Sequence, residues 1–179
     1  MRQWIVIGVL IVIIVATLWI GPKLRNMVQY NTWDYYTNQR LAELHPSIRG
    51  DMEQAINKVQ ERHGIKVRIG KDGHFRSFDL QRELYNDYQD GGPLAAPPGR
   101  SYHNYGLAAD LYIIENNQVD YSYEKYQKVA DIMQEHGFDW GYEMWGKDKP
   151  HFQKTFGYST DDLAAKRKAQ GRGKYLKLA

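Results

Sequence analysis

The chain contains no cysteine, and this absence excludes several kinds of site at once. Without thiols there is no disulfide framework, no thiolate zinc site and no cysteine nucleophile. Any metal must therefore be bound by His, Asp or Glu, and the sequence has only six histidines. The histidines are consequently the residues to follow along the chain.

A large excess of charge of one sign is also absent. The 179 residues include 24 Lys and Arg against 21 Asp and Glu, a net charge of +3. Residues 161–179 hold six basic and two acidic side chains, so the rest of the chain is close to neutral. This distribution argues against a nucleic-acid partner, which would favour a basic face across the fold. The length fits one globular domain rather than two.

One long apolar segment stands apart from the rest of the sequence. Residues 4–20, WIVIGVLIVIIVATLWI, include no charged side chain and have Trp at both ends. As a helix this segment would extend about 25 Å, slightly less than the hydrocarbon core of a bilayer. We expect an uncleaved membrane anchor over residues 1–21 rather than a signal peptide, because Ala16-Thr17-Leu18 lacks a small residue that a cleavage site needs. The few flanking charges leave its orientation open.

The remaining sequence alternates helical and strand patterns. We expect a polar stalk over residues 22–40, a domain over 41–160 and a basic C-terminal helix or tail over 161–179. Strand patterns lie at residues 65–69, 107–114 and 151–153, and helical patterns begin near Ile48, Asp79, Tyr123 and Thr160. This order of elements predicts an α+β domain.

Three segments combine residues suited to metal chemistry: 75–77 (FRS), 101–110 (SYHNYGLAAD) and 148–152 (DKPHF). Asp110 is informative because an acid within an apolar strand is costly unless it binds a cation or a strong donor. A catalytic zinc commonly has three protein ligands, and a His, Asp, His set can supply them. Asp148, three residues before His151, is placed to take a proton from a water that attacks an amide.

Each candidate also has a structural alternative. His103 fits an ordinary loop histidine, His151 a buried core histidine, and Arg76 a surface charge or a partner for Asp79. For the remaining histidines the structural alternative is favoured, because two lie near helix C-termini, one precedes a helix and one lies in a turn. They are left out of the predicted site: His45, His63, His74 and His136.

At these residues the chain resembles the VanY-like metallopeptidases, a family of D-alanyl-D-alanine carboxypeptidases and L-alanyl-D-glutamate endopeptidases that cut the peptide stems of bacterial peptidoglycan. Its members carry Ser-x-His-x-x-Gly-x-Ala-x-Asp, matched by residues 101–110, and a later acid-x-x-His, matched by residues 148–151. The arginine in a Phe/Tyr-Arg-Ser context corresponds to Arg76. The resemblance begins near Leu41 and implies a small antiparallel sheet with flanking helices, the fold shared with hedgehog signalling domains.

The resemblance also implies a role for each residue. His103, Asp110 and His151 would bind zinc, Asp148 would be the general base, and Arg76 would hold the substrate carbonyl and its developing oxyanion. The carboxypeptidase branch more often has Glu before the last histidine, whereas the endopeptidases that this chain resembles have Asp, as here. We therefore expect hydrolysis of the L-alanyl-D-glutamate bond of the stem peptide by a zinc-bound water.

Two alternatives to this activity stay open. The first is a D-alanyl-D-alanine carboxypeptidase, which needs a cation for the free carboxylate, with Arg76, Arg100 and Lys147 as candidates. The second is a non-catalytic zinc module that binds cell-wall peptides. Asp148 and Arg76 argue against the second, because a structural metal needs neither a base nor an oxyanion partner.

The expected substrate also decides the location. A membrane-anchored peptidoglycan peptidase must have its domain outside the cytoplasmic membrane, facing the cell wall or periplasm. The basic tail over residues 161–179 has two interpretations: a solvated helix face, or a contact with an anionic wall polymer or lipid head groups. We expect no nucleic acid among the partners.

Overall fold

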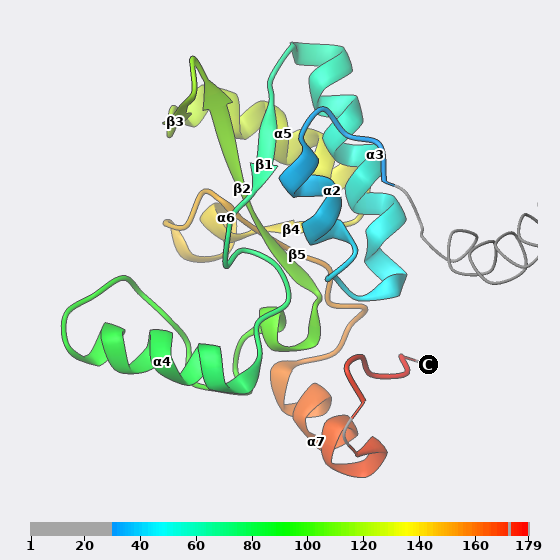
Figure 1. The fold of residues 1–179 in the computed structure, drawn as a ribbon, viewed down its shortest axis with the longest axis vertical. Helices are drawn as coiled ribbons and strands as arrows, with labels where there is room; N and C mark the ends of the chain where they lie inside the picture. The colour runs from blue at the N-terminus through cyan, green and yellow to red at the C-terminus, as the bar shows by residue number, and fades with distance from the viewer. Residues whose placement is uncertain (1–29, 172, 179) are drawn as a thin grey trace, which may run out of the picture.

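The computed structural model of the protein describes residues 30–171 and 173–178 (Figure 1). The first half contains α2 (Tyr35–Leu41), α3 (Pro46–His63), β1 (Val67–Ile69), α4 (Phe78–Gln89) and the 3₁₀ helix η1 (Tyr102–Tyr105). The second half contains β2 (Ala108–Glu115), β3 (Gln118–Asp120), α5 (Tyr123–Glu135), β4 (Asp139–Trp140), α6 (Gly141–Trp145), β5 (His151–Gln153) and α7 (Thr160–Gln170). The α+β class and the small sheet with flanking helices are confirmed.

The central strand of the sheet is β2. It pairs antiparallel with β5 through residues 108–110, with β1 through 111–113 and with β3 through 113–115. The strand order is β1-β2-β5-β4, with β3 off this path, and β4 pairs antiparallel with β5. The register sets Asp110 opposite His151, so these two side chains lie on the same face of the sheet.

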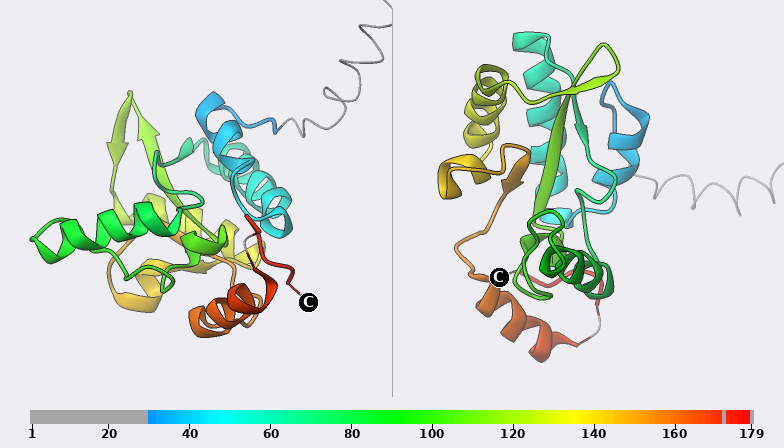
Figure 2. Two further views of the ribbon diagram at one scale, coloured as in Figure 1. Left: turned by 60° about the horizontal axis from the view of Figure 1, so that its bottom comes forward. Right: turned by 90° about the vertical axis from the view of Figure 1, so that its left-hand side faces the viewer.

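The hydrophobic core lies on the other face of the sheet, where α3 and α5 pack together (Figure 2). The predicted helical spacing is confirmed, since α3 runs to His63 and Gly64 follows with φ +65°, a left-handed value that suits glycine. The buried side chains are Ile48, Met52, Ile56 and Val59 of α3, Tyr126, Val129, Ala130 and Met133 of α5, and Ala109, Leu111 and Ile113 of β2.

The N-terminal part of the described chain is packed against the domain, although the sequence predicted a stalk up to residue 40. Asp34 caps α2, and its carboxylate accepts hydrogen bonds from Thr37 and from Arg68 of β1. Leu41 is fully buried. The contact between Asp34 and Arg68 joins residues 34 apart in sequence, so the local polar composition did not reveal it.

Among residues 30–171 and 173–178, no helix combines the length and apolar character needed to cross a membrane. The membrane anchor expected over residues 1–21, and the first part of the expected stalk, lie outside the described residues.

Helix α4 projects from the body of the domain, with the loop after it folding back toward η1 (Figures 1 and 2). Its only buried side chain is Gln81, which donates to the carbonyl of Ala96 in that loop. The apolar stripe predicted for this helix is therefore less buried than the pattern indicated: Leu80 and Leu84 are half-buried and Tyr88 is exposed.

The C-terminal segment is also part of the fold. Helix α7 is capped by Ser159, one residue before the expected Thr160, and Leu163 of this helix is fully buried. Farther on, Leu176 is buried and its carbonyl accepts a hydrogen bond of 2.7 Å from His45 Nε2. Contact of this basic segment with a wall polymer or lipid stays a prediction.

Candidate metal centre

The structure brings three of the predicted residues together, from two strands and a short helix. Asp110 lies on β2, His151 faces it from β5, and His103 lies in η1, directly before β2. Gly106 makes the turn between η1 and β2 possible, because its φ is +69° and a side chain there would meet the backbone of His45 at 2.8 Å. The chain thus returns His103 onto the same end of β2 as Asp110.

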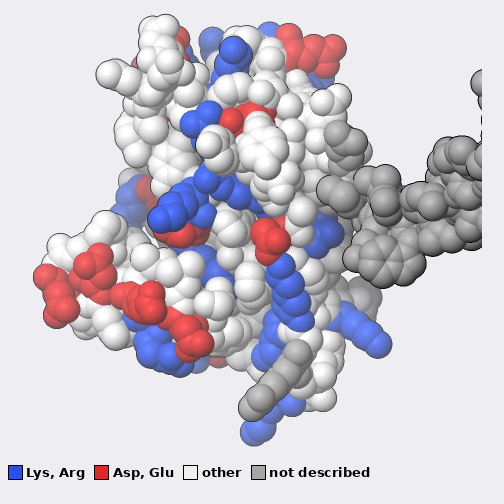
Figure 3. All heavy atoms as spheres, in the orientation of Figure 1, with Lys and Arg blue, Asp and Glu red and all other residues white. Residues whose placement is uncertain are grey.

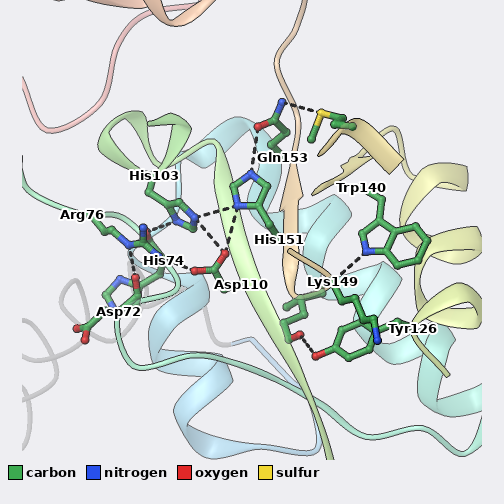
Figure 4. Close-up of polar contacts among 12 residues, drawn as sticks. Asp72, His74, Arg76, His103, Asp110, Tyr126, Trp140, Lys149, His151 and Gln153 are labelled. Atoms are coloured by element: carbon green, nitrogen blue, oxygen red, sulfur yellow. Dashed lines mark hydrogen bonds and ion pairs between the residues drawn. The ribbon is translucent and has the colours of Figure 1, made fainter. Parts of the chain in front are cut away.

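Their potential ligand atoms converge on one point (Figure 4). His103 Nε2 and His151 Nδ1 are each 3.2 Å from Asp110 Oδ1, and these two nitrogens are 3.2 Å apart. All three residues are buried, and their ligand atoms lie within 4.8 Å of one another. The fold therefore brings the three residues, which are distant in sequence, to one place.

The outer nitrogen of each imidazole already has an acceptor. His103 Nδ1 is 2.9 Å from the carbonyl oxygen of His74, and His151 Nε2 is 3.1 Å from Gln153 Oε1. If both outer nitrogens donate, the inner nitrogens and the Asp110 carboxylate present only lone pairs to one another. Three acceptors at this spacing repel one another unless a cation lies between them, so the residues fit a bound metal.

Burial and mutual charge set the protonation of the cluster. Burial lowers the pKa of His103 to about 4, which favours the neutral, metal-binding form. Burial opposes ionisation of Asp110, but its neighbours His103, His151 and Arg76 outweigh burial and hold the pKa of Asp110 well below its ordinary value. The carboxylate is therefore ionised and able to bind a cation.

Arg76 adjoins the cluster through the second oxygen of Asp110. Its Nη2 donates to Asp110 Oδ2 at 2.5 Å and its Nε donates to the carbonyl of Asp72 at 2.5 Å. The Asp110 carboxylate is thus shared between Arg76 on one oxygen and the two histidines on the other. The structure places Arg76 beside the site, with a partner that the sequence did not predict.

Asp148 lies in the loop between α6 and β5, where the residue as a whole is exposed but its carboxylate is partly desolvated. Its φ is +70°, a left-handed value that Asp adopts more readily than most residues. The carbonyls of the next two residues accept hydrogen bonds from Trp140 Nε1 and from the amide of Leu111, so the loop is tied to both neighbouring strands. Desolvation is the main cause that raises the pKa of Asp148 above its ordinary value, opposed by His151 and aided by Asp110.

Sequence reasoning missed two residues at the centre. Gln153 is buried and contacts His151, and the alternation of side chains along β5 was the signal that could have found it. Trp145, at the end of α6, has its ring 5.3 Å from that of His151 and remains 50% exposed. The spacing of Trp145 from His151 carried no such signal.

The surface is hollowed between α4 and the body of the domain (Figure 3). Acidic side chains form a row along α4 in the same view, and exposed residues at helical spacing account for them, namely Asp79, Glu83 and Asp87. A buried His, Asp, His cluster with a further aspartate on the loop before the last histidine fits the class of metal-dependent hydrolases.

Comparisons with known proteins narrow this class. A family described as D-alanyl-D-alanine carboxypeptidase matches residues 95–154, the segment that holds His103, Asp110, Asp148 and His151. Peptidoglycan L-alanyl-D-glutamate endopeptidase CwlK of Bacillus subtilis (strain 168) is 33% identical over 127 residues, which cover 63% of this chain and 74% of that protein. The crystal structure of Serratia marcescens L-Ala D-Glu endopeptidase ChiX aligns with a TM-score of 0.54 and 22% identity, covering 73% of this chain and 95% of that chain.

The likeness to ChiX shows a shared fold. The similarity to CwlK shows the family as well as the fold, because the aligned residues are 33% identical and cover 74% of that protein. The chain belongs to the VanY-like family of D-alanyl-D-alanine peptidases and is a metallopeptidase. The expected family is therefore confirmed.

Proposed function

We propose that this protein is a zinc-dependent peptidoglycan peptidase that hydrolyses the L-alanyl-D-glutamate bond of the stem peptide. The convergence of His103, Asp110 and His151 supports the proposal of a metal, and the endopeptidase activity of CwlK supports the choice of bond. Bound zinc supplies a Lewis acid and makes water a nucleophile near neutral pH.

Two residues near the proposed metal supply the remaining chemistry, namely proton transfer and binding of the substrate carbonyl. The Asp148 carboxylate takes a proton from the attacking water and gives it to the departing amine. Its raised pKa suits a group that must both accept and release a proton near neutral pH. Arg76 holds Asp110 in place, and its remaining N–H donors bind the substrate carbonyl oxygen as charge develops there.

A terminal D-alanine carboxypeptidase is less well supported by the surroundings of the site. That activity needs a cation for the free carboxylate of the substrate. In the proposed mechanism the remaining donors of Arg76 bind the substrate carbonyl oxygen, and Arg100 pairs with Asp161 of α7. Of the candidate cations from the sequence, the exposed Lys147 then remains. An endopeptidase has no such requirement.

We also propose that residues 1–21 anchor the enzyme in the cytoplasmic membrane, with the domain facing the cell wall or periplasm. The apolar run at residues 4–20 and the location of the substrate support this arrangement. Protease treatment of intact spheroplasts tests it: the domain should be digested from outside, whereas protection until the membrane is lysed would contradict the orientation.

The decisive experiment is mass spectrometry of purified muropeptides after incubation with the full chain in mild detergent and zinc. We expect release of stem peptides cut after L-alanine, and a chelator should stop it. Loss of a terminal D-alanine alone would instead establish the carboxypeptidase activity. Zinc binding without any change in muropeptide mass would support the binding module.

A pair of variants tests the division of roles. Asp148→Ala should retain zinc but lose about 10²- to 10⁴-fold in turnover, the usual contribution of a general base. His151→Ala should lose both zinc and turnover. Asp131→Ala, an exposed acid of α5, is the control and should change neither. Loss of zinc from the Asp148 variant would contradict its assignment as the base.

A further inference from the structure

The two histidines of the metal centre are held in different ways. The outer nitrogen of His103 meets a backbone carbonyl, whereas that of His151 meets the side chain of Gln153 (Figure 4). A backbone carbonyl is present whatever the residue type, but a side-chain amide depends on one residue. A substitution can therefore change the tautomer of His151 by removing its hydrogen-bond partner, whereas the partner of His103 would remain.

Gln153 is built into the sheet beside the site. It lies two residues after His151 on β5, so both side chains project from the same face. It is 4% exposed, and its register partners are Ala108 of β2 and Asp139 of β4. A polar side chain this deeply buried needs hydrogen-bond partners.

The contacts of the Gln153 amide determine which of its two terminal atoms faces His151. Gln153 Oε1 is 3.1 Å from His151 Nε2, and Gln153 Nε2 is 3.5 Å from the sulfur of Met144. A thioether accepts a weak hydrogen bond and donates none, so the NH₂ group belongs on the sulfur side. The amide oxygen is then the atom that faces His151. Because this oxygen can only accept a hydrogen bond, His151 Nε2 must carry the proton.

We infer that Gln153 is a positioning residue that keeps the proton of His151 on Nε2 and its lone pair on Nδ1, toward the metal. The opposite tautomer would place a proton on Nδ1, 3.2 Å from both Asp110 Oδ1 and His103 Nε2, and would close the site to a cation. This inference rests on the proposed metal-dependent function, because it assigns a residue that acts through a metal ligand.

Three variants of the full chain test the inference. Gln153→Leu removes the acceptor at similar volume, and Gln153→Glu keeps an oxygen there. Gln81→Leu is the matched control, since Gln81 of α4 is also a buried glutamine and its amide donates to the carbonyl of Ala96 rather than contacting the cluster. Zinc affinity is measured by competition with a chelator, and the ring nitrogens of His151 in the metal-free protein are measured by ¹⁵N NMR.

Gln153→Leu should bind zinc about 10- to 100-fold more weakly, the usual effect of removing such a partner. Its His151 signals should shift toward a mixture of the two tautomers. Gln153→Glu should retain the Nε2–H tautomer and most of the zinc affinity, and Gln81→Leu should match the wild type in both measurements. This set separates tautomer control from simple filling of the core.

Unchanged zinc affinity and an unchanged tautomer in a folded Gln153→Leu variant would overturn the inference while leaving the proposed function intact. If that variant does not fold, Gln153→Glu decides the matter, since a loss of the Nε2–H tautomer there would equally overturn it. Failure of the wild type to bind zinc would instead overturn the proposed function, and this inference with it.

Discussion

The two faces of β2 have different roles, although their residues alternate along a single strand. Ala109, Leu111 and Ile113 face the core and are buried against α3 and α5. Asp110 faces the other side, toward His151 and Arg76. The comparison shows how a strand buried at five of its eight positions can hold one acid at low cost.

Packing on the core face makes the strand rigid, and this fixes the position of Asp110 on the opposite face, which we call the open face. Because successive side chains point to opposite faces, the apolar neighbours of Asp110 fix its backbone without surrounding its carboxylate. The carboxylate meets polar partners on its own face instead. Substitutions on the two faces should therefore separate stability from metal binding.

The largest effect is expected on the open face. Asp110→Ala removes a metal ligand and the partner of Arg76, and should reduce zinc affinity and turnover by more than about 100-fold, beyond the loss typical of an outer partner. Chelator competition and muropeptide hydrolysis measure both. Asp139→Ala, an exposed acid on β4, is the control. Retained activity in the Asp110 variant would remove this face from the mechanism.

A pair of neighbouring isoleucines gives the sharpest contrast between the faces. Ile113→Ala, on the core face and 2% exposed, should lower the free energy of unfolding by about 2–5 kcal/mol. Ile114→Ala, half-buried on the other face, should lower it by clearly less. Urea denaturation compares the two, and equal losses would contradict the assignment of the core face.

A smaller effect is expected where the open face is closely packed. A Cβ at Gly141 would lie 2.9 Å from His151 Cβ and 2.9 Å from the Asp148 carbonyl oxygen. Gly141→Ala should destabilise the domain by about 1–3 kcal/mol and weaken zinc binding, because His151 must move. Gly50→Ala in α3 meets nothing within 4 Å and should instead stabilise slightly. Thermal unfolding with and without zinc measures both.

The smallest effect concerns the ion pair between Arg68 of β1 and Asp34, the N-cap of α2. Arg68 projects from the same face of the sheet as Asp110, but this pair contributes to stability. Burial opposes the charge of Asp34, yet hydrogen bonds from Arg68 and Thr37 outweigh it and hold the pKa of Asp34 below its ordinary value. Its stabilising effect is present above the unfolded pKa near 3.9 and is lost as the pH falls through the lower folded value.

Asp34→Asn removes this charge but keeps a good helix cap. It should cost about 1 kcal/mol at pH 7, since Arg68 is partly exposed to solvent. The difference from the wild type should shrink at low pH. Urea denaturation at several pH values checks this, and a difference independent of pH would show that the charge plays no part.

Much of the centre could be predicted from sequence because its signals are local. The apolar strand with one acid indicated Asp110, and the short spacings to His103 and from Asp148 to His151 followed known motifs. The helical period of α3 was equally clear, because one stripe of apolar residues faces the core.

The parts that could not be predicted depend on contacts between distant residues. The partner of Arg76 lies 34 residues away, and the His45 contact with Leu176 spans 131 residues. Neither leaves a periodic pattern in the sequence. The projection of α4 was hidden for a related reason, since a helical stripe indicates a face but not whether anything covers it.

The register of β2 and β5 gives a cation a second effect, on the chain rather than on the substrate. Asp110 and His151 are 41 residues apart, so an ion bound by both closes the intervening chain into a loop. Such a closure restricts the unfolded chain as a covalent crosslink would. In a protein without cysteine, the ion that activates water would also be the crosslink that the chain otherwise lacks.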